Sequence, residues 1–232
     1  MILSKTGCKK VKNKYVIMTI VVICCIVMGV VDAVLRPGYI VKSALKLPLF
    51  LILPIVCSYR FHSKELKSLF VPTKGGIAKA LLMGIVVYAV ILGTYFALKG
   101  VFDFSMVTSA LTADVGVTAQ NFVWVALYIS FVNSLLEEFF FRGFSFMLLK
   151  KESGRLTAYI FSALAFSLYH IAMMIGWFDW AVIFFAVLGL FAGGIIFNWF
   201  NEKNKNIYMS WLVHMFANFA INTVGFILFG IL

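Results

Sequence analysis

The chain has 232 residues, of which 63% are hydrophobic and 12% are charged, and its mean hydropathy is +1.02. These values exclude a soluble globular domain and predict an integral membrane protein. The net charge of +11 does not call for a nucleic-acid partner, because the basic residues collect in short segments between apolar runs.

Seven apolar runs are each long enough to cross a hydrocarbon core of about 30 Å as a helix. The sequence therefore predicts an all-α fold, a polytopic membrane bundle of about seven transmembrane helices, with eight as the alternative. We expect residues 1–232 to form a single integral membrane domain. The runs are 15–35, 39–59, 77–98, 121–149, 156–176, 180–200 and 207–232.

The basic residues predict the orientation in the membrane. If the N-terminus is cytoplasmic, fifteen of the twenty Lys and Arg fall on the inside and four on the outside, so the C-terminus is expected outside a multi-pass cell-membrane protein. The inner residues are Lys5, Lys9, Lys10, Lys12, Lys14, Arg60, Lys64, Lys67, Lys74, Lys79, Lys150, Lys151, Arg155, Lys203 and Lys205; the outer ones are Arg36, Lys42, Lys46 and Lys99.

Three details of the runs bear on packing and processing. The first run ends in VDA at 31–33, so a cleaved signal peptide is the alternative interpretation of it. Lys42 and Lys46, in the second run, are expected to reach the interface by snorkelling. In the sixth run Gly189 and Gly193 form a GxxxG pair, with Gly194 beside it, which predicts close approach of a neighbouring helix.

Ionisable side chains inside the later runs need an explanation, because a charge at mid-membrane costs about 2.5–3.5 kcal/mol. The stretch NSLLEEFFFRGF contains Glu137, Glu138 and Arg142. Glu138 and Arg142 are four residues apart and predict a buried ion pair on one helix face. Glu137 lies about 100° around the helix, which leaves it available for other chemistry. The phenylalanines of this stretch are expected to face lipid and neighbouring helices.

Two of the three histidines also fall inside predicted spans. His170 follows Phe166 by four residues, and His214 precedes Asn218 by four, so each pair shares one helix face. At ~1.5 Å per residue these polar groups and Glu137 lie at depths of roughly 10–21 Å, so we expect them to form one site. The alternative is that they only make hydrogen bonds between helices.

The spacings EExxxR, FxxxH and HxxxN occur in this order as Glu137 to Arg142, Phe166 to His170 and His214 to Asn218. Together they resemble the CAAX protease and bacteriocin-processing (Abi) family of intramembrane peptidases, with a peptidase core at about 121–232. The resemblance implies an endopeptidase in which Glu137, assisted by His170, activates a water. It also implies that His214 and Asn218 stabilise the oxyanion, while Glu138 and Arg142 are structural members of the motif.

The resemblance leaves the mechanism and the role open. A metal-free mechanism is favoured, with zinc bound by Glu137, His170 and His214 as the alternative. The expected partners are membrane lipid and a membrane-associated or prenylated-type peptide or protein, and not nucleic acid. Bacteriocin self-immunity within the same family is the alternative role. A proton-coupled transporter is the alternative from another class, although the chain lacks the paired Gly/Pro-broken spans of inverted repeats.

Overall fold

The computed structural model describes residues 5–61, 68–71 and 75–232, and within these ranges every regular element is helical. Lys64, Lys67 and Lys74, which contribute to the predicted orientation, lie outside the described residues. The elements are α1 (Lys5–Val30), η1 (Val31–Leu35), α2 (Tyr39–Leu47), η2 (Pro48–Ile52), α3 (Leu53–Phe61), α5 (Ile77–Leu98), α6 (Ser105–Val115), α7 (Phe122–Leu127), η3 (Tyr128–Asn133), α8 (Ser134–Glu137), η4 (Glu138–Leu148), α9 (Leu149–Ser153), α10 (Arg155–Tyr169), α11 (Ile171–Met174), α12 (Trp180–Asn204) and α13 (Tyr208–Leu228), where η denotes a π-helix.

Seven helical stretches of the described chain are long and apolar enough to span a membrane, which confirms the predicted all-α membrane bundle. Several spans join successive elements, as in the fourth, where α7, η3, α8, η4 and α9 follow one another without a break. The spans are Asn13–Leu35, Tyr39–Tyr59, Ile77–Leu98, Phe122–Ser153, Arg155–Met174, Trp180–Asn204 and Tyr208–Leu228.

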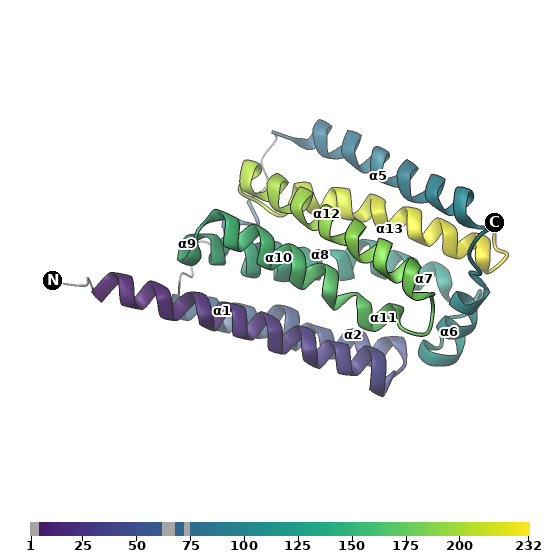
Figure 1. Cartoon of the computed structure of the whole chain (residues 1–232), viewed down its shortest axis with the longest axis horizontal. Coiled ribbons are helices and arrows are strands. Elements are labelled where there is room, and N and C mark those ends of the chain that lie inside the picture. Colours follow the sequence, from purple (N-terminus) through teal and green to yellow (C-terminus); the bar gives the residue numbers. More distant parts are fainter. Residues whose placement is uncertain (1–4, 62–67, 72–74) are drawn as a thin grey trace.

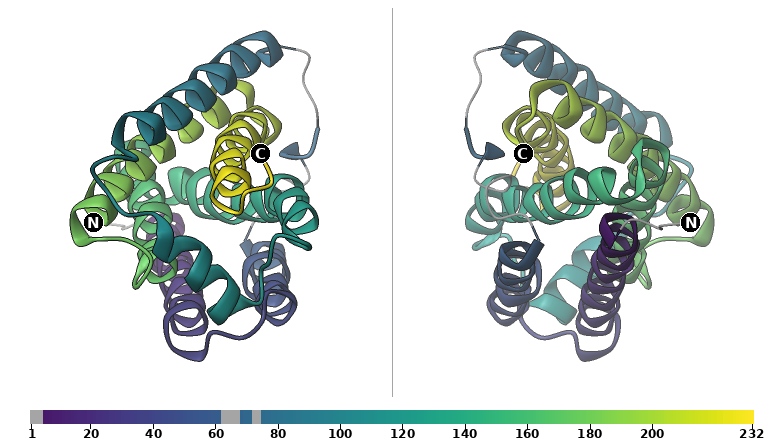
Figure 2. Two further views of the ribbon diagram at one scale, coloured as in Figure 1. Left: turned by 90° about the vertical axis from the view of Figure 1, so that its right-hand side faces the viewer. Right: turned by 90° about the vertical axis from the view of Figure 1, so that its left-hand side faces the viewer.

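The fourth span lies at the centre of the bundle. The pair α1 and α2 lies on one side and α5 on the opposite side, with the later helices between them (Figures 1 and 2). The η4 segment contacts α1, η2, α10 and α12, so it has protein neighbours on several sides. Its reversal into the fifth span takes place at Gly154, whose φ of 99° is accessible to glycine with little strain.

The phenylalanines of the EEFFFRGF stretch in the fourth span face the protein interior and not the lipid. Phe140, Phe141 and Phe144 are completely buried, and Phe139 is 2% exposed, so the lipid-facing part of the prediction is wrong. Two causes are visible: η4 is surrounded by other helices, and it is wound as a π-helix, with bonds from i to i+5. The π-helical winding changes the angular spacing that an α-helical pattern assumes.

A close helix crossing occurs at Gly194 rather than at the GxxxG pair. A Cβ atom on Gly194 of α12 would lie 3.0 Å from the backbone Cα of Ala163 in α10, whereas Gly189 and Gly193 have nothing within 4 Å of that position. The predicted close approach therefore exists, but Gly194 makes it.

This crossing gives a testable difference between adjacent glycines. Gly194→Val is expected to lower the free energy of unfolding by about 1–3 kcal/mol, because the backbone of α10 must move away. Gly193→Val is the matched control and is expected to change it by less than about 0.5 kcal/mol. Unfolding in bicelles measures both variants, and equal effects would contradict the assignment.

Candidate active site

Glu137 ends α8 and is only 2% exposed. Its Oε1 atom accepts hydrogen bonds from Nζ of Lys46 at 2.6 Å and from Nδ2 of Asn133 at 3.1 Å. Its Oε2 atom faces Nε2 of His170 at 3.8 Å and Nε2 of His214 at 3.7 Å. Glu137 therefore has a charged partner at Oε1, whereas Oε2 is directed toward two imidazole rings.

The partner of Glu137, Lys46, is a residue that the sequence placed at the membrane interface. It is 3% exposed, and its ammonium also donates to Oδ1 of Asn133 at 2.6 Å. The ammonium lies 5.1 Å from the ring centre of Phe50 and 5.2 Å from that of Tyr169. Lys46 therefore points into the bundle and does not snorkel, because the acid, the amide and two aromatic rings solvate it there.

Lys42, the other lysine of this span, is also paired. Its Nζ lies 2.6 Å from Oδ1 of Asp32 in η1, and the Asp32 side chain is fully buried. Both lysines of α2 thus neutralise carboxylates of other helices. Two lysines one turn apart in an apolar span are the feature of the sequence that could have indicated buried ion pairs, but their spacing does not identify the acids that they contact.

His170 lies where α10 ends. Its Nδ1 is 2.7 Å from the carbonyl oxygen of Phe166, four residues earlier. A carbonyl only accepts, so Nδ1 carries the proton and Nε2 presents a lone pair to Glu137. The FxxxH spacing thus has a geometric meaning, because a side chain at i+4 can reach the carbonyl of residue i near the end of the helix.

His214 reaches the same point from α13. Its Nδ1 lies 2.9 Å from Oε1 of Glu138, and its ring stacks on Phe197 at 5.4 Å between centres. Since an ionised Glu138 can only accept, His214 also carries its proton on Nδ1 and turns the lone pair of Nε2 toward Glu137. Glu138 therefore orients a histidine of the site in addition to pairing with an arginine.

Arg142 and Glu138 are both completely buried, with 3.4 Å between Nη1 and Oε1. The guanidinium lies 3.9 Å from the ring centre of Phe166 and 4.8 Å from that of Phe197. None of its nitrogens has a hydrogen-bond acceptor among the described residues. Coulombic attraction to Glu138 and the two aromatic faces are therefore what balance the burial of this charge.

Asn218 makes its hydrogen bond away from these groups. Its Nδ2 donates to the carbonyl of Ile129 in η3, and Asn222, one turn later in α13, donates to the carbonyl of Ala126 and to Ser130. Both amides thus bind the fourth span where its winding changes from α to π. The structure brings Glu137, His170 and His214 together, and it uses Asn218 to hold the adjoining backbone.

The charges of the cluster balance: Lys46 and Arg142 are positive, and Glu137 and Glu138 are negative. In the described ranges no group of three or more His, Cys, Asp or Glu side chains is arranged to hold a metal ion. In addition, the ammonium of Lys46 occupies one oxygen of Glu137. Oε2 is the oxygen of Glu137 that faces the histidines, and the zinc set of Glu137, His170 and His214 stays the alternative prediction.

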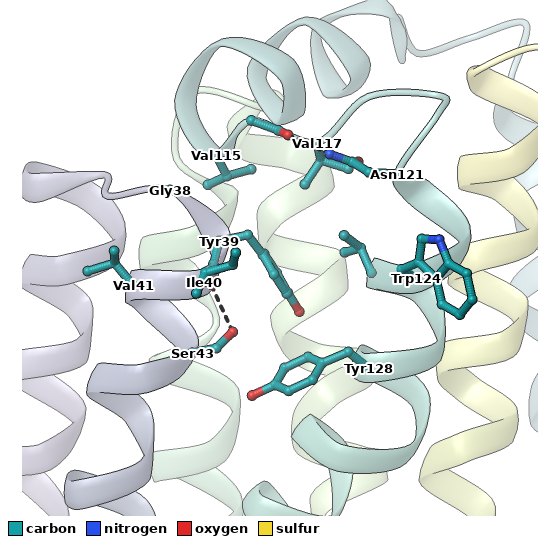
Figure 3. Close-up of a pocket in the computed structure, with 12 residues that line it drawn as sticks. Gly38, Tyr39, Ile40, Val41, Ser43, Val115, Val117, Asn121, Trp124 and Tyr128 are labelled. Atoms are coloured by element: carbon teal, nitrogen blue, oxygen red, sulfur yellow. Dashed lines mark hydrogen bonds between the residues drawn. The ribbon is translucent and has the colours of Figure 1, made fainter.

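A pocket of about 610 Å³ opens between α2 and α7, at the end of the bundle where the C-terminus lies (Figures 1 and 3). Tyr39, Trp124 and Tyr128 are among its lining residues, and the two tyrosine rings meet edge to face at 5.7 Å. Lys46 follows Tyr39 by seven residues on the same span, or about 10 Å along the axis. The pocket thus lies roughly two turns from the Lys46–Glu137 contact.

The fold and this cluster define the class of the protein: a multi-pass membrane protein with acids and histidines joined inside the bundle. Residues 119–220 match the family described as type II CAAX prenyl endopeptidase Rce1-like. The match contains all three motifs, confirms the resemblance to the CAAX protease family, and supports an intramembrane endopeptidase of the CAAX type. No curated protein and no solved structure matches the chain.

Proposed function

We propose that this protein cleaves a peptide bond of a membrane-associated peptide or protein with a water activated by Glu137. The observation that carries the proposal is the convergence of Glu137 Oε2 with the Nε2 atoms of His170 and His214 at 3.7–3.8 Å. These distances are too long for direct hydrogen bonds, and a water between the atoms can donate one proton to Oε2 of Glu137 and the other to one of the two imidazole nitrogens.

In this arrangement each of the two protons of the attacking water has an acceptor. The water donates one proton to Oε2 of Glu137 and the other to an imidazole lone pair, and its own lone pair attacks the substrate carbonyl. Glu137 then holds the transferred proton and delivers it to the leaving amine. His170 and His214 keep their orientation through the bonds from Nδ1 to Phe166 and Glu138.

For the oxyanion we propose Asn218 without His214, because the N–H of His214 is directed at Glu138 and its Nε2 atom is an acceptor. The amide nitrogen of Asn218 has two N–H groups, of which one is accounted for by Ile129. The second can donate to a carbonyl that enters from the side of His214, where the charge develops. The apolar pocket between α2 and α7 supports a substrate whose hydrophobic segment enters along these helices.

We also propose the orientation indicated by the basic residues, with the N-terminus in the cytoplasm of a cell-membrane protein. The side chains of Lys150 and Arg155 support it, since both pair with Glu202 at one end of the bundle. In this orientation the pocket opens toward the outer half of the membrane.

The test is cleavage of membrane-peptide libraries by the purified protein in lipid nanodiscs, with the products sequenced by mass spectrometry. His170→Ala and His214→Ala are each expected to lower kcat by about 10²–10⁴-fold, because each removes an acceptor from the water site. A strong chelator should leave wild-type cleavage unchanged. Cleavage that survives both substitutions would overturn the site, and loss of cleavage in chelator that zinc restores would overturn the metal-free mechanism.

A further inference from the structure

We infer that Lys46 is a positioning residue of the catalytic site, which holds Oε1 of Glu137 so that Oε2 alone faces the two histidines. This inference rests on the proposed function. It adds a residue from α2 that lies outside the segment 119–220 shared with the peptidase family. The site is thus completed by the N-terminal half of the chain.

The contacts form a closed triangle. Lys46 Nζ donates to Glu137 Oε1 and to Asn133 Oδ1, both at 2.6 Å, and Asn133 Nδ2 donates to the same Glu137 oxygen at 3.1 Å. Asn133 and Glu137 are four residues apart on one span. A carboxylate held through one oxygen by two donors cannot rotate, so its second oxygen keeps a fixed direction.

The surroundings show that this contact is built into the interior. Lys46 and Glu137 are 3% and 2% exposed, and the rings of Phe50 and Tyr169 cover the ammonium. His170 and His214 approach the other oxygen of this carboxylate. An amine buried in this way pairs with an acid, because an isolated ammonium would be strongly destabilising there.

Positioning has a kinetic signature that differs from a purely structural role. Without Lys46 the carboxylate can turn, and a misplacement of about 1 Å in an attacking group can cost on the order of 10²-fold in rate. Substrate contacts are unaffected, so the loss belongs in kcat and not in KM. A structural role would lower only the amount of folded protein and leave kcat per folded molecule unchanged.

The experiment measures kcat and KM per folded molecule in nanodiscs. Lys46→Met is expected to lower kcat by about 10–100-fold with KM within about twofold, and Lys46→Arg, which keeps the charge, should retain more activity. Lys42→Met is the matched control, since it breaks the other buried pair of α2, with Asp32, and should keep the wild-type kcat. Wild-type kcat in Lys46→Met would overturn the inference.

Two further measurements keep the test decisive. If Lys46→Met does not fold, Asn133→Ala removes the anchor of the triangle but leaves both charges, and it should lower kcat several-fold; an unchanged kcat would overturn the inference. The second measurement is the free energy of unfolding of Lys46→Met, of Glu137→Gln and of the double variant, which can be determined without any cleavage assay. If the folding equilibrium constant of the double variant is at least about 10-fold higher than the two single variants predict by additivity, the contact between Lys46 and Glu137 is supported even if the wild type cleaves nothing. Strictly additive effects would overturn it.

Discussion

Replacement of Glu137 by Gln is expected to lower kcat by about 10³-fold or more. The carboxamide has nearly the same shape, but it cannot take the proton of the attacking water, and general-base catalysis contributes about 10²–10⁴-fold. The substitution also removes the charge that faces Lys46 at 2.6 Å, so part of the protein is expected to unfold. The assay therefore reports kcat per folded molecule.

Glu202→Gln is a suitable control for this variant. Glu202 also accepts hydrogen bonds from basic side chains, with Arg155 at 2.9 and 3.0 Å, but it lies on α12 near the end of the bundle. It is expected to keep wild-type cleavage. If Glu137→Gln cleaved as fast as the wild type, the base would have to be another group and the proposed function would lose its main support.

Replacement of Arg142 by Met is expected to have the largest effect on stability, about 3–5 kcal/mol of unfolding free energy. Removal of the guanidinium leaves Glu138 fully buried with His214 as its remaining partner among the groups described above. Loss of one member of a buried ion pair typically costs this much, because the other charge stays uncompensated. Denaturant unfolding in a fixed lipid–detergent mixture measures the change.

A second substitution separates charge from shape. The double variant Glu138→Gln with Arg142→Met removes both charges, while the amide oxygen at 138 can still accept from Nδ1 of His214. It is expected to regain most of the lost stability. A double variant as unstable as Arg142→Met alone would show that Arg142 acts through its packing on Phe166 and Phe197 and not through its charge.

The number of spans and the location of the buried acids and histidines could be predicted from the sequence, because both depend on local properties. Twenty apolar residues make a span whatever their neighbours are, and an ionisable residue inside such a run must meet other polar groups. The spacing of four residues also predicted the contact of Glu138 with Arg142, because α-helical geometry approximates the winding of this segment well enough for that pair.

The remaining features depend on contacts between distant segments. Lys46 lies 91 residues before Glu137, and nothing in its own span indicates which acid it meets. The π-helical winding of η4 has no compositional signature, so the inward direction of Phe139 to Phe141 could not be derived. Asn218 shares a helix face with His214 but binds the backbone of η3, since carbonyls near a change in winding need donors.

The pairing of Lys46 with Glu137 also has a consequence for biosynthesis. Among the seven spans of the described chain the fourth has the lowest hydropathy, 1.4, and ahead of its polar end at 150–153 it carries Glu137 and Glu138 against Arg142 alone, so it is the least suited to enter the bilayer unaided. The second span has a hydropathy of 2.0 and is synthesised before the fourth. It carries Lys46, the positive charge that pairs with Glu137. Lys46 therefore reaches the membrane before Glu137, the acid whose charge it balances, because the second span is synthesised before the fourth.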